Sequence, residues 1–165
     1  MKKQFLKVLL VIFLFGMVAS FCNAQTSNSP SGIGRQVFEA LKILNSSGDR
    51  LSGLFLIRQD GNMLYRELIT KAAQRGLSDW SKIEYMNYIH KEFRRDGTNY
   101  SSGYLAVKFN GTSDYTSFGI YLLNIQAGNG YKILICNDKW SRNPVSSISW
   151  EDIRENLDDL EEWLD

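Results

Sequence analysis

The chain has 165 residues, of which 44% are hydrophobic and 22% charged, and its formal net charge is +1. This length suits one domain with a single hydrophobic core. The near-neutral charge disfavours nucleic-acid binding, which needs clustered Lys and Arg. With His90 as its only histidine, the sequence excludes a metal site built from several histidines.

Residues 1–24 have the pattern of a secretory signal peptide. Lysines come first, the apolar stretch 9–15 follows, and small residues lead to Ala24, after which we expect cleavage. The mature chain would then be periplasmic or secreted. The apolar run is too short and interrupted for a spanning helix of about 20 residues, so no stable membrane span is expected. Lipid anchoring at Cys22 is the alternative, which Phe21 disfavours because a small residue normally precedes a lipidated Cys.

Removal of this leader, which holds three Lys and no acid, leaves 141 residues with a net charge of −2. Residues 25–32 are small and polar, which predicts a flexible tether before a single domain over 33–165. Cys136 is then the one remaining cysteine, so no internal disulfide is expected. Its apolar neighbours in 131–138 predict a buried thiol, with a redox or nucleophilic role as the alternative.

Two segments have the signals of amphipathic helices. Along 33–45, apolar residues recur at spacings of four, four and three. Ser81 and Glu84 form a capping-box pattern, which predicts that another helix begins there. Gly97 would end this second helix. Its apolar face would carry Ile83, Met86, Ile89, His90 and Phe93.

The stretch 51–70 admits two interpretations. In the first, 54–58 and 63–67 pair as a hairpin around the turn signal Asp60-Gly61. In the second, a short helix is followed by a longer one over 63–74. The helix-forming composition of the longer segment favours the second interpretation.

Beyond Gly103 the apolar residues recur with a period of two, which is typical of strands. This period predicts strands over 104–109, 115–125 and 131–138, each separated from the next by five residues of turn composition. These strands would form an antiparallel meander, and the preceding segment 97–104 is expected to be a flexible loop. Trp140, just after the last strand, is expected to cap the core.

The end of the chain predicts an amphipathic helix. Ser149 provides a cap, and apolar residues then share one face: Trp150, Ile153, Leu157, Leu160 and Leu164. Residues 149–165 hold eight acids and one Arg. This charge marks either the solvated face of a terminal helix or a binding surface for a basic partner.

Helices followed by a meander predict an α+β fold, in which N-terminal helices pack on an antiparallel three- to four-stranded meander and a C-terminal amphipathic helix follows. The order resembles the cystatin-like and nuclear-transport-factor-like superfamily, particularly its small exported bacterial members. In these, a first helix with a pattern like 38–42 (FEALK) runs into a polar turn like 45–49 (NSSGD). The resemblance implies a cone-shaped cavity that serves catalysis, small-ligand binding or neither. The C-terminal helix departs from the family, whose chains more often end on a strand.

The motifs of nucleophile elbows, dinucleotide sites and phosphate loops are absent from the sequence, and no cofactor or metal is expected. His90 and Cys136 form the only conceivable pair of thiol and base. Because the predicted helix would place His90 on an apolar face, packing explains the pair better than catalysis.

The sequence supports three functional hypotheses. The preferred one is an exported, non-enzymatic binding protein that acts through a protein surface or a small cavity. The second is a periplasmic immunity or inhibitor protein that neutralises a basic toxin or enzyme through its acidic terminal helix. The third is a cavity enzyme of the nuclear-transport-factor-like type that uses His90, with Tyr121 or Asp138.

Overall fold

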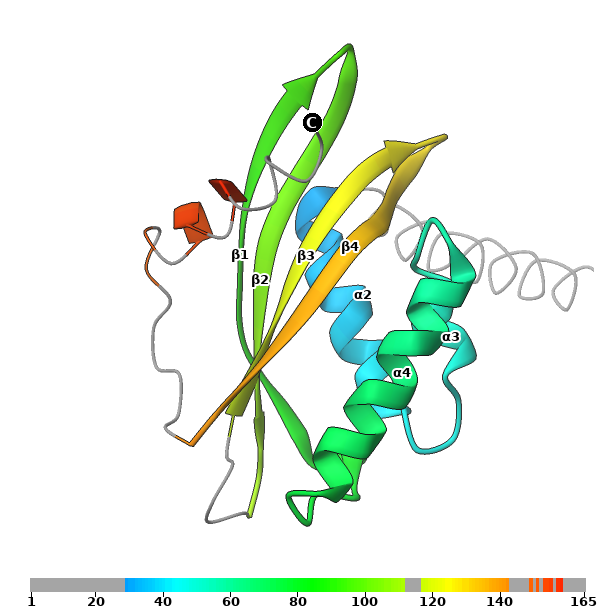
Figure 1. Ribbon diagram of the computed structural model, residues 1–165, viewed down its shortest axis with the longest axis vertical. Coiled ribbons are helices and arrows are strands. Elements are labelled where there is room, and N and C mark those ends of the chain that lie inside the picture. The colour runs from blue at the N-terminus through cyan, green and yellow to red at the C-terminus, as the bar shows by residue number, and fades with distance from the viewer. Residues whose placement is uncertain are drawn as a thin grey trace, which may run out of the picture.

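The protein is an α+β domain, shown as a computed structural model in Figure 1. The structure describes residues 29–111, 117–142, 149, 151, 153–155, 157 and 158. Its elements in chain order are α2 (Pro30–Lys42), α3 (Asp49–Ser52), α4 (Arg58–Ala73), the 3-10 turn η1 (Trp80–Lys82), β1 (Ile83–Arg95), β2 (Thr98–Phe109), β3 (Ser117–Ala127) and β4 (Gly130–Ser141). The strands form one antiparallel sheet in the order β1-β2-β3-β4. The expected α+β class and the antiparallel meander are therefore confirmed.

The first predicted helix is present as α2, but it begins at Pro30. The Ser29 hydroxyl accepts a hydrogen bond from the Gly32 N–H. Pro30 suits the first helical position, because an N–H there would have no acceptor within the helix and proline has none to satisfy. The last three residues of the expected tether are therefore helical. The signal peptide, its cleavage site and the rest of the tether lie outside the described residues.

The ambiguous stretch 51–70 forms helices, as the composition favoured. Asp60-Gly61 lies inside α4 and is not a hairpin turn. Gly61 is needed for another reason: a Cβ there would lie 2.6 Å from the Cα of Ser52 and 2.8 Å from the Phe55 ring. Glycine therefore permits α3 and the segment after it to pack closely against α4.

The prediction of a helix that begins at Ser81 is wrong, because the segment forms the end of η1 and then strand β1. Asp79, and not Ser81, supplies the cap: its carboxylate accepts from the Ser81 N–H at the start of η1. The partner strand β2 pairs with β1 from Ile83 opposite Phe109 to Arg95 opposite Thr98. This long ladder outweighs a local helical preference, which is a weak signal.

A β-bulge explains why β1 has a helix-like sequence. The register with β2 shifts between Tyr85 and Asn87, so one extra residue enters the strand there. As a result Met86, Ile89 and Phe93 pack on the same face of the sheet at spacings of three and four. These are helical spacings, although the backbone is extended.

The predicted helix stop at Gly97 is a hairpin turn between β1 and β2. Asp96 and Gly97 have φ angles of 49° and 78°, the left-handed conformation that two-residue hairpin loops require. Segment 97–104, expected to be a flexible loop, belongs to this turn and to β2. The strand predicted over 115–125 is β3, and the start of the predicted range lies outside the described residues.

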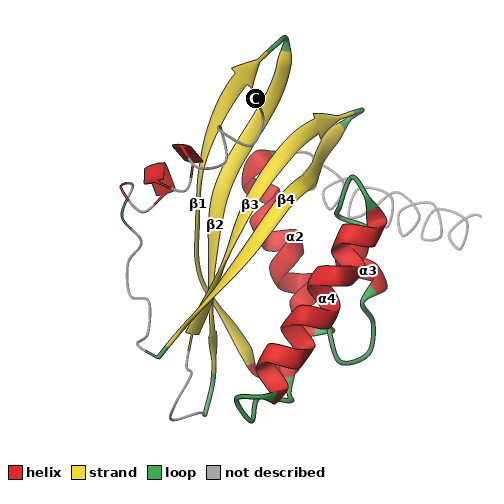
Figure 2. Ribbon diagram, in the orientation of Figure 1, coloured by secondary structure: helices red, strands yellow, loops and turns green. Residues whose placement is uncertain are grey.

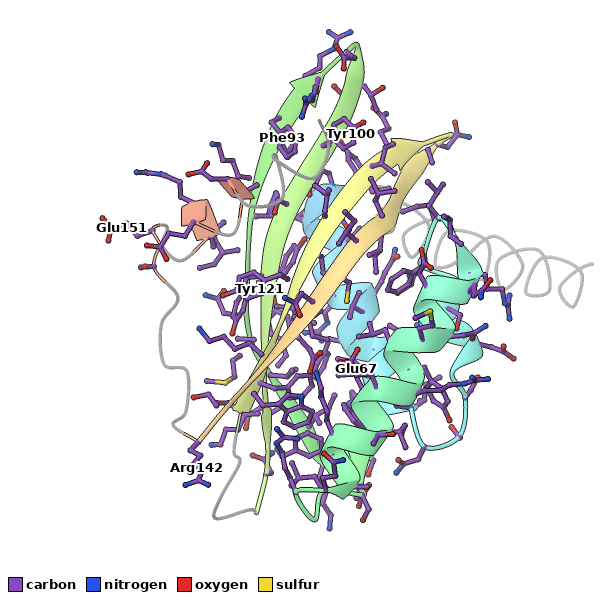
Figure 3. The ribbon with its side chains drawn as sticks, viewed as in Figure 1. Glu67, Phe93, Tyr100, Tyr121, Arg142 and Glu151 are labelled. Carbon is purple, nitrogen blue, oxygen red and sulfur yellow. The ribbon has the colours of Figure 1, made fainter. Side chains whose placement is uncertain are left out.

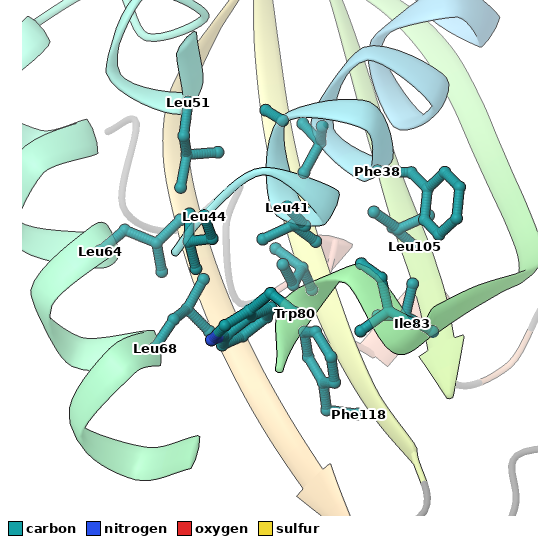
Figure 4. Close-up of a cluster of buried hydrophobic side chains, with 14 of the residues drawn as sticks. Phe38, Leu41, Leu44, Leu51, Leu64, Leu68, Trp80, Ile83, Leu105 and Phe118 are labelled. Carbon is teal, nitrogen blue, oxygen red and sulfur yellow. The ribbon is translucent and has the colours of Figure 1, made fainter. Parts of the chain in front are cut away.

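The main core lies on one face of the sheet, the face that the three helices cover in Figure 2. Leu41 of α2, Leu44 just after α2 and Leu68 of α4 are fully buried. They pack with Trp80 (Figure 4). The Trp80 ring contacts those of Phe109 and Phe118 edge-on at 5.1 and 5.7 Å. This cluster holds α2 and α4 to the sheet through apolar burial.

A smaller apolar cluster lies on the opposite face of the sheet. Tyr104 and Ala106 of β2 are buried there together with Ile153 and Leu157. Most of the predicted terminal helix lies outside the described residues, but those described within 151–158 are helical. Both faces of the sheet are thus covered at β2.

Tyr88 seats α2 on the sheet, because its ring lies between two glycines. A Cβ at Gly34 of α2 would overlap the Tyr88 ring, and one at Gly103 of β2 would lie 2.5 Å from the Tyr88 hydroxyl. Only glycine at both positions leaves room for the ring.

Replacement of Gly34 by Ala tests this seating. In an ordinary helix interior, Gly→Ala stabilises by up to about 1 kcal/mol. Here we expect Gly34→Ala to lower the free energy of unfolding by about 1–3 kcal/mol, since the new methyl group must displace the Tyr88 ring or α2. Urea unfolding measures the change. A stabilised variant would contradict the close packing of Tyr88 on α2.

Candidate functional site

His90 and Cys136 do not form the thiol and base pair that the sequence left open. Both lie in one row across the sheet, in which His90 is opposite Gly103, Gly103 opposite Leu122, and Leu122 opposite Cys136. Neighbouring strands are 4.7–4.9 Å apart, so the ends of this row are about 14 Å apart. Proton transfer between the two side chains is therefore excluded in this arrangement.

The structure also keeps His90 apart from its other suggested partners. Tyr121 pairs with Tyr104 on the opposite face of the sheet, where their ring centroids lie 4.3 Å apart. Asp138 is at the far edge, three strands away from β1. His90 instead stacks on Tyr88 at 5.7 Å, and its Nε2 lies 3.6 Å from the Glu92 carboxylate.

Cys136 packs against the main core, which agrees with the predicted structural role. Burial raises the pKa of its thiol far above the ordinary value, and the nearby negative charges of Asp138 and Glu67 raise it further. The thiol therefore stays protonated at neutral pH, and a protonated thiol is a poor nucleophile.

A pocket of about 290 Å³ lies between α4 and β4. Its lining residues come from α4, β4 and the segment before α4: Phe55, Asp60, Met63, Leu64, Glu67, Leu134, Ile135 and Cys136. Figure 3 labels Glu67 between α4 and the strand. Apolar walls with a few polar groups are typical of ligand sites, and this volume is near the lower end of their range.

The local course of β4 shapes this pocket. The register between β3 and β4 shifts between Leu123 and Asn124, which places an extra residue, Leu134, in β4 at the pocket. Next to it, the Ile133 N–H donates to the Leu54 carbonyl and the Leu56 N–H donates to the Ile133 carbonyl. The segment before α4 is thus fixed to the outer edge of β4 and closes one end of the pocket.

An ionic network connects α4 to β4 beside the pocket. The Lys71 ammonium lies 2.6 Å from Glu67 and 2.9 Å from Asp138, whose side chain is only 2% exposed. Partial burial alone would lower the pKa of Lys71, but hydrogen bonds to both carboxylates outweigh burial and raise it. The Trp140 indole N–H donates to Asp138 at 2.6 Å. The network therefore joins α4 to β4 through a buried carboxylate.

Trp140 has the capping position expected from the sequence, at the open side of the core. Its ring stacks on Phe118 at 4.7 Å, and the Arg75 guanidinium lies 4.7 Å above the Trp140 ring. The indole therefore covers the core and orients Asp138 at the same time.

Asp60 adds a second negative charge to the pocket. The residue is half-buried, and within the described part of the chain no cation or hydrogen-bond donor contacts its carboxylate. It lies in the first turn of α4, where the positive end of the helix dipole stabilises a negative charge. Sequence reasoning does not find Asp60, because Asp60-Gly61 is a turn signal.

Three large apolar side chains are exposed around the pocket. Leu56, Ile57 and Met63 have 47%, 55% and 63% of their surfaces exposed. Leu56 is bonded to β4 beside Leu134, Ile57 precedes α4, and Met63 lines the pocket itself. Leu56 and Ile57 thus follow directly on Phe55, which lines the pocket, and we call the pocket together with the three exposed side chains the α4–β4 surface.

A buried polar cluster lies deeper in the domain, under α2. The Asn124 amide donates to the Tyr88 hydroxyl at 3.5 Å and to the Ser101 hydroxyl at 3.4 Å. Burial raises the pKa of Tyr88 to about 12, against the lowering effect of hydrogen bonds from Asn124 and Ser101. Asn124 and Ser101 are completely buried, so this cluster is part of the packing and not an open site.

Two kinds of feature are absent from the described residues, a metal-binding cluster and a membrane-spanning helix. No group of three or more His, Cys, Asp and Glu side chains there is arranged to hold a metal ion. Among the described helices, none has the length and apolar character needed to span a membrane.

The chain matches no protein-family model, no curated protein and no solved structure.

Replacement of Asp138 by Asn tests the network between α4 and β4. Removing one partner of a buried ion pair leaves Lys71 with less compensation, so we expect the free energy of unfolding to fall by about 2–3 kcal/mol. Asp49→Asn is the matched control, because Asp49 pairs with Arg58 at 2.6 Å but is 81% exposed. The control should change stability little. Equal effects in urea unfolding would show that burial of the Asp138 pair is unimportant.

The raised pKa of Tyr88 predicts a loss of stability at alkaline pH. Its pKa is about 12 in the folded chain against 10.0 for an ordinary Tyr, so above pH 10 the unfolded state releases this proton first. The stabilisation that comes from this raised pKa is complete below pH 10 and is lost as the pH rises through 12. It falls by about 1.4 kcal/mol per pH unit in that window.

The Tyr88→Phe variant isolates this effect from other groups, such as Cys136, that titrate in both proteins. We expect the unfolding free energy of the unchanged protein, measured relative to that of the variant, to fall steadily between pH 10 and 12. Denaturant unfolding at both ends of this window measures it. A difference that does not depend on pH would refute the proposed burial of the Tyr88 hydroxyl.

Proposed function

We propose that the chain is an exported, non-enzymatic binding protein and that the α4–β4 surface is its binding site. The observation that carries the proposal is the combination, in one pocket, of apolar walls and the half-buried Asp60 carboxylate without a partner in the described residues. A ligand with an apolar part and a hydrogen-bond donor or cation would cover the exposed Met63 and pair with this carboxylate.

Binding accounts for these groups better than catalysis. The Cys136 thiol at the pocket is held protonated, and the Glu67 carboxylate is paired with Lys71. His90 is three strands away from β4. The thiol that lines the described pocket is therefore not activated, as covalent catalysis by cysteine requires.

Purification of the chain from its producing cells tests the proposal. Native mass spectrometry of the purified protein should show a retained species, and Met63→Glu should reduce its occupancy at least about tenfold, because a carboxylate would then lie in the apolar wall. Met63 is 63% exposed, so this change leaves the core intact.

Ile43→Glu is the matched control, since Ile43 is also an exposed apolar residue (38%) but lies at the end of α2, outside the pocket lining. It should retain the bound species as the unchanged protein does. A retained species that is insensitive to Met63→Glu, or no retained species at all, would count against the α4–β4 surface as the binding site.

A further inference from the structure

Building on the proposed function, we infer that the α4–β4 surface binds a protein segment that presents a basic side chain between apolar residues. The basic side chain enters the pocket beside Asp60 and Glu67, and its apolar neighbours cover Leu56, Ile57 and Met63.

The charges at the pocket favour a cation. The lining of the pocket holds two carboxylates, those of Asp60 and Glu67, and no Lys or Arg side chain. Glu67 pairs with Lys71, whereas Asp60 has no cation or hydrogen-bond donor as partner among the described residues. A Lys or Arg terminus would compensate Asp60, while an anionic ligand would be repelled.

The apolar part of the site favours a long side chain with an apolar stem. Phe55, Leu64 and Ile135 contribute apolar walls between the opening and the core. A Lys or Arg side chain buries its methylene groups along such walls and keeps its charged end at a carboxylate. The pocket volume of about 290 Å³ holds one such side chain without the rest of a large ligand.

The surroundings of the pocket favour a protein segment over a small free cation. Leu56, Ile57 and Met63 are each about half exposed or more, on the surface that adjoins the pocket. A small cation inside the pocket would leave Leu56 and Ile57 uncovered. Neighbouring apolar residues of a bound chain would cover them, which adds burial of apolar surface to the ionic contact.

A second copy of this chain fits the site less well. A two-fold symmetric contact would bring the same surface of both copies together. It would place Asp60 and Glu67 of one copy close to the same carboxylates of the other, and like charges in an interface are unfavourable. We therefore assign the site to a different protein, with the opposite charge at its centre.

Methionine methyl groups provide a direct readout of this binding. Met63 lines the pocket, and Met86 packs on the opposite face of the sheet. In the full chain with methyl-¹³C methionine, Met63→Leu assigns the Met63 signal. The probes are a blocked pentapeptide with a central lysine (Val-Leu-Lys-Leu-Val), the same peptide with a central glutamate, and n-butylammonium.

We expect the lysine peptide to shift the Met63 methyl signal and leave that of Met86 unchanged. Asp60→Asn should weaken this binding about tenfold, as expected for loss of a hydrogen bond to a charged group. Asp96→Asn is the matched control, because Asp96 is 95% exposed in the β1–β2 turn, and it should alter the affinity less than about twofold. The glutamate peptide and n-butylammonium should bind at least about tenfold more weakly than the lysine peptide.

Each other result overturns the inference. Equal binding of the glutamate peptide excludes a basic partner, and equal binding of n-butylammonium shows a site for small cations. Absence of a Met63 shift with the lysine peptide excludes the proposed segment. The retained species described above separates the two proposals: if its occupancy depends on Met63 while the peptides do not bind, only the identity of the occupant is wrong. If neither depends on Met63, the α4–β4 surface is not the site.

Discussion

The contact between Lys71 and the buried Asp138 fixes the position of α4 on the outer strand β4, and the pocket depends on that position. One wall of the pocket comes from α4 and the other from β4, so a small shift of either would change its shape. Apolar packing alone tolerates sliding between a helix and a strand, whereas a pair of 2.9 Å with a hydrogen bond from Trp140 has one favourable geometry. The Leu54–Leu56 segment fixes the same strand from its edge.

Elements whose signal is local were predicted from the sequence. The helix α2 and three of the strands have apolar spacings that burial on one face requires, and α4 has the composition of a stable helix. The prediction failed for β1 for two reasons. Its bulge gives an extended strand the apolar spacings of a helix, and Ser81 with Glu84 has the sequence pattern of a helix cap. Only the partner strand β2 decides between helix and strand, and pairing at that distance in sequence has no local signal.

The candidate site could not be found by the same reasoning. Its residues come from 55–67 and 134–136, and they meet only because β4 lies beside α4. The sequence singled out His90, the rarest residue type, but the sheet register places it about 14 Å from Cys136. Asp60 was hidden by its neighbour Gly61, which together with it forms a turn signature. In the structure, that glycine serves the close packing of α3 and α4.

An outer strand beside exposed apolar side chains is ordinarily a risk, because unpaired strand edges promote association with other chains. In this protein the risk is limited at one end, where Leu54 and Leu56 bond to both backbone groups of Ile133. Beyond that point the edge is flanked by the pocket, whose two carboxylates would oppose contact with the same surface of a second copy. In the proposed site, charge would select which partner can use a surface that apolar burial alone would leave unselective. The roles would then be divided, because the apolar groups would supply contact area and the Asp60 carboxylate would supply selection.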